Sequence, residues 1–196
     1  MCIIAAAGAI LNAVTGHVCT ALFSFPVFLD TVFIIAITFA FGLLGGAICG
    51  ALTSLLILAI SSAVNSFDPF FLSDLIHFLT HISFAVVTWL FMKIFARELN
   101  FKKGAWEPLP IWNKSSSLSI AIDKFFVLII LSFLLCLISG ISSELRIVSF
   151  GIRGIMPSQI LYNILLNTLD KTICVYAGLF LSYALRSFFK VSSQRP

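Results

Sequence analysis

Several side chains that could bind a ligand lie inside or beside long apolar segments of this sequence. Asp30 is followed by Thr31 and is the single charged residue of segment 25–55. A charge without a partner inside a membrane costs several kcal/mol, so every such residue needs a partner or a ligand. Asp30 is therefore the first candidate for contact with a polar molecule.

Two further sets of polar residues have the spacing of one helix face. Asp74, His77 and His81 are spaced i, i+3 and i+7, and Asn163, Asn167 and Asp170 are spaced i, i+4 and i+7. Together with Asp30 they are predicted to face the outer half of a membrane, around a polar cavity open to the outside. The expected substrate-binding residues are Asp30, Thr31, Asp74, His77, His81, Asn163, Asn167 and Asp170.

Structural roles are alternatives for some of these residues. Asp30 and Thr31 could cap the helix that begins there, and capping is compatible with ligand contact. His77 and His81 could be neutral packing residues. A metal site would need these histidines together with Asp74 or His17, and we expect no metal and no cofactor.

Asp170 is the hardest of these residues to explain by structure alone. The next residue, Lys171, points about 100° away around a helix, which predicts that it is a poor direct partner. The stripe that ends in Asp170 therefore favours a polar ligand.

The composition indicates a membrane protein. Of the 196 residues, 60% are hydrophobic and 10% are charged, and the mean hydropathy is +1.12. A soluble domain of this size cannot bury so much apolar surface, so the solvent is lipid. The net charge of +4 is small and scattered, which argues against nucleic acid as a partner. Motifs of hydrolases, zinc proteases and nucleotide-binding loops are missing from the sequence, so an enzyme is not expected.

The apolar segments predict a single all-α membrane domain over residues 1–196. Glycines at Gly42, Gly45, Gly46 and Gly50 indicate that segment 25–55 folds into a hairpin of two membrane helices. Asp68 is expected to cap the helix that starts at Pro69. The six expected transmembrane helices span about 2–22, 30–45, 46–65, 69–97, 118–143 and 157–189.

The basic residues predict the orientation. Lysines and arginines cluster in and around the loop 98–117 and after the last helix, which places both regions and both termini in the cytoplasm. The loops 23–30, 65–69 and 144–157 are then outside. The residues that set this orientation are Lys93, Arg97, Lys102, Lys103, Lys114, Arg186, Lys190 and Arg195.

The first apolar segment carries Ala5, Ala9 and Ala13 at four-residue spacing. Such a stripe lets another backbone approach closely. The partner is either another subunit or another helix of the same chain, and the sequence leaves both open.

Three short segments resemble a known family. Residues 25–31 read FPVFLDT, residues 41–47 read FGLLGGA, residues 50–53 read GALT, and the last helix carries Asp170 and Lys171. They resemble the substrate-binding S components of energy-coupling factor (ECF) transporters. The closest likeness is to the branch with Pro-x-x-Leu-Asp-Thr/Ser and Gly-x-x-x-Gly around the second helix and an Asp-Lys pair in the last. The sequence departs from that branch at Val32 and Phe33, where Gly-Thr is usual.

The resemblance implies a multi-pass protein of the bacterial inner (cytoplasmic) membrane. It implies capture of a vitamin or related micronutrient outside, and delivery by docking on a T subunit driven by two ATPase subunits. The family uses the alanine stripe, here Ala5, Ala9 and Ala13, to meet the T subunit. Its lid over the ligand corresponds here to Phe25, Pro26 and Phe28. The alternatives are a sensory or scaffold subunit that binds a ligand without transport, and a stand-alone ion-coupled carrier with Asp170 as its proton site.

Overall fold

The computed structural model describes residues 2–23, 29–64, 71–95, 125–151 and 154–189, and within these ranges the regular structure is helical, with no strand. The lid residues Phe25, Pro26 and Phe28, the expected cap at Asp68 and the loop 98–117 lie outside the described residues. The described helices are α1 (Cys2–Phe23), α2 (Val32–Phe41), α3 (Leu43–Val64), α4 (Phe71–Ile94), α6 (Phe125–Ser149) and α7 (Pro157–Phe188).

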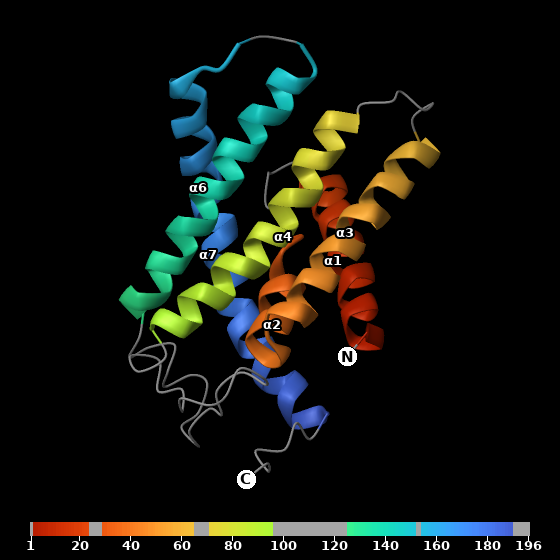
Figure 1. Ribbon diagram of the computed structural model, residues 1–196, viewed down its shortest axis with the longest axis vertical. Helices are drawn as coiled ribbons and strands as arrows, with labels where there is room; N and C mark the ends of the chain where they lie inside the picture. Colours follow the sequence, from red (N-terminus) through yellow and green to blue (C-terminus); the bar gives the residue numbers. More distant parts are fainter. Residues whose placement is uncertain (1, 24–28, 65–70, 96–124, 152–153, 190–196) are drawn as a thin grey trace.

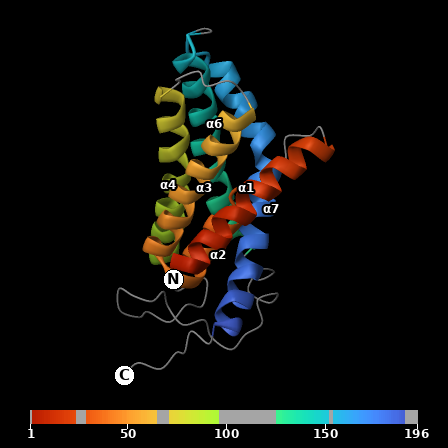
Figure 2. The ribbon, with the colours of Figure 1, turned by 90° about the vertical axis from the view of Figure 1, so that its right-hand side faces the viewer.

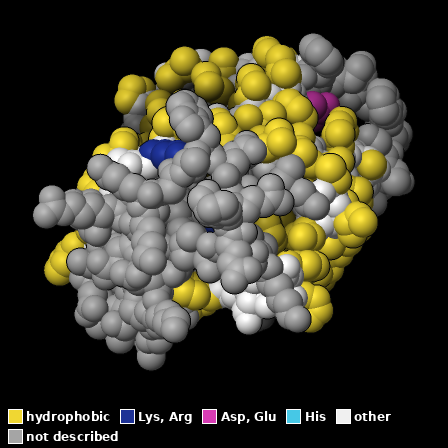
Figure 3. Space-filling view, turned by 60° about the horizontal axis from the view of Figure 1, so that its bottom comes forward, with side chains coloured by type: hydrophobic (Ala, Val, Ile, Leu, Met, Phe, Trp, Pro, Cys, Tyr) yellow, Lys and Arg dark blue, Asp and Glu magenta, His cyan; other side chains and the backbone are white. Residues whose placement is uncertain are grey.

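Four of these helices are long and apolar enough to cross a membrane, which indicates a multi-pass membrane protein. The four stretches are Leu43–Ile60, Leu72–Ile94, Phe125–Ser149 and Pro157–Phe188. Their outward faces carry large apolar side chains, and the described surface in Figure 3 is mostly apolar. Lipid, rather than water, suits such a surface.

Helix α2 is the short helix at the centre of the bundle. It packs against α1, α3, α4 and α7, and its residues from Ile34 to Ala40 are all buried (Figures 1 and 2). Ten residues extend about 15 Å, whereas the hydrocarbon core of a membrane is about 30 Å thick. Helix α2 therefore covers about half of that thickness.

The turn between α2 and α3 lies at Gly42. Its φ of 89° is in the left-handed region, where glycine has no steric penalty, and its N–H bonds the carbonyl of Thr38 at 3.0 Å. The bounds predicted for the second helix, 30–45, are therefore wrong at both ends. Asp30 and Thr31 precede the helix, and Gly45 and Gly46 belong to α3.

The loop expected at 144–157 is also shorter than predicted. Helix α6 continues to Ser149, and Glu144, expected in the loop, is a fully buried residue of that helix. Its Oε1 accepts a hydrogen bond of 2.8 Å from the N–H of Met156, the residue before α7. This bond ties the end of α6 to the start of α7, which explains how the helix tolerates a buried carboxylate.

The alanine stripe of α1 packs inside the molecule. Ala5 and Ala9 are fully buried and Ala13 is nearly so, because α1 crosses α2 and α3 on this side (Figure 2). The stripe is therefore not a free docking surface in this structure, and internal packing is the alternative that holds. The face of α1 turned away from the bundle carries Ile3, Ile10, Leu11, Val14 and Val18.

Candidate functional site

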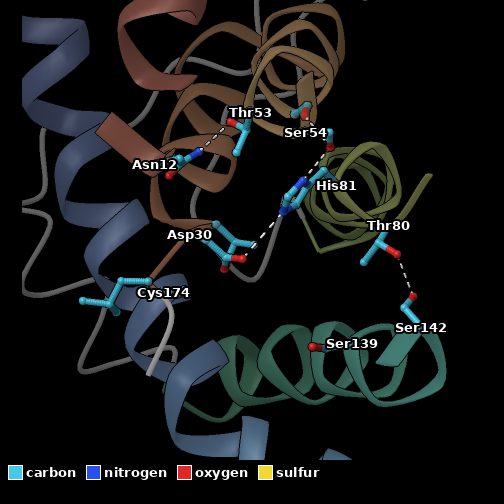
Figure 4. A network of polar contacts seen from close by, with 12 residues as sticks. Asn12, Asp30, Thr53, Ser54, Thr80, His81, Ser139, Ser142 and Cys174 are labelled. Carbon is cyan, nitrogen blue, oxygen red and sulfur yellow. Dashed lines mark hydrogen bonds and ion pairs between the residues drawn. The ribbon is translucent and has the colours of Figure 1, made fainter. Parts of the chain in front are cut away.

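Asp30 lies just before α2, where the chain enters the bundle. Its Oδ1 is 3.4 Å from Nζ of Lys171 in α7, and its Oδ2 is 3.7 Å from Nε2 of His81 in α4 (Figure 4 shows the contact with His81). The Asp30 side chain is 19% exposed, whereas those of Lys171 and His81 are 3% and 1% exposed. Asp30 is thus the most accessible member of a buried ionic group, and both of its ionic contacts are long.

Lys171 is the centre of this ionic group. Its Nζ donates a hydrogen bond of 2.7 Å to Oδ2 of Asp170, which is fully buried, and one of 3.5 Å to Oγ1 of Thr31. The prediction that Lys171 is a poor partner for Asp170 is wrong. The angle between adjacent positions on a helix does not limit a lysine, because its four-carbon stem lets the ammonium turn back.

Asp170 also holds the irregular chain segment before α2. Its Oδ1 accepts a hydrogen bond of 3.1 Å from the N–H of Leu29, and the thiol of Cys174 lies 3.8 Å from the same oxygen. Leu29 has a φ of 38°, an unusual backbone conformation for a residue other than glycine. Backbone groups that are not part of a helix need other hydrogen-bond partners inside a protein, and Asp170 provides one for Leu29.

His81 connects the ionic group to α3. Its Nδ1 is 2.7 Å from Oγ of Ser54, and α3 comes close at this level because Gly50 has no side chain. A Cβ at Gly50 would lie 2.8 Å from the backbone oxygen of His81. The ring of His77, one turn earlier, makes an edge contact with that of His81, with centroids 4.4 Å apart.

The first turn of α2 is capped from α1. Oδ1 of Asn12 accepts a hydrogen bond of 3.0 Å from the N–H of Phe33, and its Nδ2 lies 3.3 Å from Oγ1 of Thr53 in α3 (Figure 4). Thr31 has the N-cap position but makes no side-chain cap bond, so capping by Asp30 and Thr31 is not observed. Asn12 was not among the residues predicted from the sequence, where its one signal is a lone amide in an apolar segment.

A second set of polar contacts joins the other helices. Oγ of Ser139 donates to Oδ1 of Asn167 at 3.2 Å, and Nδ2 of Asn167 donates to the carbonyl of Asn163 at 2.6 Å. Oγ1 of Thr80 donates to Oγ of Ser142 at 2.8 Å (Figure 4). These contacts are neutral and join α6 to α7 and α4 to α6.

The expected binding residues therefore lie in three separate places. Five of them meet at the amino end of α2, and we call these together with Lys171 and Ser54 the α2 cluster. Asp74 lies in the first turn of α4, about two turns away from His81. Asn163 and Asn167 belong to the contacts between α6 and α7. The α2 cluster consists of Asp30, Thr31, Ser54, His77, His81, Asp170 and Lys171.

The end of a helix stabilises the two carboxylates of the α2 cluster. The amino end of a helix carries partial positive charge, and both carboxylates lie beside that of α2. Among the described residues, no group of three or more histidine, cysteine or acidic side chains is arranged to hold a metal ion. The arrangement is suited to bind a polar or charged organic group through a carboxylate, a hydroxyl and an imidazole.

Comparison of the chain with protein-family models, curated proteins and solved structures finds no match.

Proposed function

We propose that this protein is the substrate-specific S component of an ECF-type importer of a vitamin or related micronutrient. One observation supports it most. The two motifs that carry the resemblance, at residues 29–31 and at Asp170 and Lys171, meet in space although about 140 positions separate them. Motifs with no common role have no reason to converge on one buried group.

The broken helix is a second support. Transporters commonly bind substrates near the middle of the membrane, where short helices end and present their backbone termini. The amino end of α2 lies beside His81 and Asp170, which stand well inside α4 and α7. Asp30 is more exposed than Lys171 and His81, and its contacts with both are long. It is therefore the residue best placed to exchange a protein partner for a ligand.

The proposed topology has six membrane segments with α2 and α3 forming a hairpin and both termini in the cytoplasm. Lys93 at the end of α4 and Arg186 in the last turn of α7 mark the cytoplasmic end. The ligand arrives from the opposite end of the bundle. A T subunit and two ATPase subunits in the bacterial cytoplasmic membrane then drive its release inside.

Affinity purification in mild detergent from the native cell tests this proposal. A T subunit and two ATPases are expected to be recovered with the protein, together with a small molecule identified by mass spectrometry. Recovery of a sensor kinase, or of no partner, contradicts the transport role and favours a sensory or scaffold subunit.

Two matched variants locate the ligand. Asp30→Asn removes the charge of the accessible carboxylate in the α2 cluster and is expected to lower the retained ligand at least tenfold. Asp74→Asn makes the same change on a half-buried carboxylate about two turns from His81 and is expected to retain the ligand. If the two variants retain equal amounts of ligand, the binding site does not lie at the α2 cluster.

A stand-alone ion-coupled carrier is the second candidate, because the buried α2 cluster carries an excess negative charge when its histidines are neutral. Purified protein in liposomes would then accumulate the identified ligand under a pH gradient without any ATPase. Asp170→Asn would abolish that uptake. Failure of the isolated protein to accumulate ligand excludes this carrier.

A further inference from the structure

Arg146, in the last turn of α6, has N–H donors that no described residue accepts from. Its Nε donates a hydrogen bond of 3.2 Å to Oγ of Ser73, a buried residue of α4. Its two terminal nitrogens have no hydrogen-bond partner among the described residues, although Arg146 is half-buried. The terminal nitrogens of a guanidinium form a planar fork that binds a carboxylate through two parallel hydrogen bonds. Arg146 is therefore able to bind an acidic group that lies between α4 and α6.

His77 lies next to this arginine and also has an unused polar atom. Its Nε2 is buried and has no hydrogen-bond partner among the described residues. Along α4, His77 lies between Ser73 and Thr80, which both contact α6, because positions 73, 77 and 80 share one helix face. A buried polar atom without a partner is unfavourable, so a ligand that bonds Nε2 removes a cost that the protein otherwise carries.

Electrostatic interactions connect Arg146 to the α2 cluster. Arg146 interacts with Asp30 and with Asp74, and His77 interacts with both Arg146 and Asp30. Asp30 is the accessible carboxylate of the α2 cluster, and its contacts of 3.4 Å and 3.7 Å are both long. Arg146, His77 and Asp30 thus present a guanidinium, an imidazole and a carboxylate to one small region.

The charges of this region favour a ligand with groups of both kinds. Apart from Lys93 and Arg186, in the last turns of α4 and α7, the described carboxylates outnumber the described cations. The carboxylates are those of Asp30, Asp74, Glu144 and Asp170, and the cations are those of Arg146 and Lys171. A ligand that is only an anion adds to this excess of negative charge, whereas one that also carries a positive or N–H group gives Asp30 a partner.

We propose that the ligand is a small carboxylic acid that also carries an amino or ring N–H group. The terminal nitrogens of Arg146 bind its carboxylate, Asp30 accepts a hydrogen bond from its N–H group, and Nε2 of His77 bonds a polar atom between them. This inference rests on the proposed function, because it names the chemical class of substrate for the same site. It also adds Arg146 to the residues that bind the substrate.

Equilibrium dialysis of the purified protein in lipid nanodiscs tests the proposal. The probes are an equimolar mixture of amino acids and amino-substituted aromatic and heteroaromatic carboxylic acids, each with its carboxamide and its deaminated analogue. Mass spectrometry measures which probes the protein retains. We expect at least one probe with both groups to be retained, and its carboxamide and deaminated analogue to be retained about tenfold less. The proposal is overturned if either analogue is retained as well as its parent acid, or if no probe with both groups is retained.

Variants assign each group of the probe to a residue. Arg146→Gln is expected to remove the preference for the acid over its carboxamide and to keep the preference for the amino group, whereas Asp30→Asn is expected to do the reverse. Arg146→Lys keeps the charge without the planar fork, so it should reduce the first preference by a smaller factor, and it serves if Arg146→Gln does not fold. An unchanged preference for the acid in both Arg146 variants contradicts the assignment.

Arg186→Gln is the matched control for the loss of an arginine. Arg186 is also half-buried, but its guanidinium contacts the carbonyl of Phe39, near the carboxyl end of α2, at 3.3 Å. This variant is expected to keep both preferences. If it removes the preference for the acid as Arg146→Gln does, the effect belongs to the general loss of positive charge and the assignment to Arg146 is wrong.

The outcomes also separate this inference from the proposed function. A protein that is purified with a T subunit and two ATPases but retains a probe without an acidic group contradicts the inference alone. A protein that retains a probe with both groups but is purified with no partner contradicts the transport role alone.

Discussion

The amino end of α2 and the interface between α6 and α7 are both polar regions inside an apolar bundle, but they are built differently. At α2, two carboxylates, an ammonium and an imidazole surround a break in the helical chain. Between α6 and α7, hydroxyls and amides join two continuous helices, as Ser139 and Asn167 do.

The difference separates two uses of polarity in a membrane. A neutral hydrogen bond between continuous helices satisfies both of its members and leaves no charge to compensate. A charged side chain inside a membrane is unfavourable unless it has a partner, and such side chains are characteristic of functional sites. The α2 cluster combines charge with non-helical backbone, so function is expected there rather than between α6 and α7.

The largest effect should come from removing the ammonium. Lys171→Met leaves the carboxylates of Asp30 and Asp170 without their common cation, and breaking a buried pair costs about 3–5 kcal/mol in the free energy of unfolding. Denaturation of the purified protein by SDS measures it. Lys93→Met changes an exposed lysine at the end of α4 and should have a small effect.

A double variant distinguishes charge from packing in that result. Lys171→Met combined with Asp30→Asn has one buried carboxylate instead of two and should recover part of the lost stability. If the double variant is no more stable than Lys171→Met, the role of the lysine is packing, and the contrast between the two regions is not one of charge.

An intermediate effect is expected at the cap of α2. Asn12→Leu removes the acceptor for the N–H of Phe33 and should lower the free energy of unfolding by about 1–2 kcal/mol. Thr53→Val leaves the cap bond in place, removes the contact of Oγ1 with the amide nitrogen and the bond of the hydroxyl to the carbonyl of Cys49 within α3, and should cost less. Equal losses in the two variants would show that the cap bond itself contributes little.

The smallest effect is expected between continuous helices. Thr80→Val removes the hydrogen bond to Ser142, and with it the bond of the hydroxyl to the carbonyl of Ile76 one turn earlier, while preserving shape; it should cost about 0.5–1.5 kcal/mol. A double-mutant cycle with Ser142→Ala isolates the bond. A loss as large as that of Lys171→Met would remove the distinction between the two regions.

Much of the helical architecture is predictable from the sequence, because long apolar segments identify the membrane helices. The charges at Asp30, His81 and Asp170 were also recognisable, since ionisable residues are conspicuous in such segments. The spacing rule placed Asn167 and Asp170 on one face of α7, and both are buried. The spacing did not show that Asn167 contacts α6, whereas Asp170 contacts the segment that precedes α2.

Other features depend on tertiary contacts that spacing does not encode. The position of the turn at Gly42 follows from its left-handed backbone, and neighbouring glycines offered equally plausible positions. Glu144 looked like a loop residue because the sequence does not show that Met156 folds back to it. The reach of Lys171 depends on side-chain flexibility, which a helical projection ignores.

The position of α2 has a consequence for how the protein is made. Asp30 and Lys171 are 141 positions apart, so the ribosome completes five of the described helices before the one that supplies the ammonium exists. A helix of ten residues spans too little of the bilayer to be anchored there alone. Until the last segment is inserted, the amino-terminal half is an unfinished assembly. A nascent chain that stops before α7 is therefore expected to be recognised by the cell as misfolded and degraded.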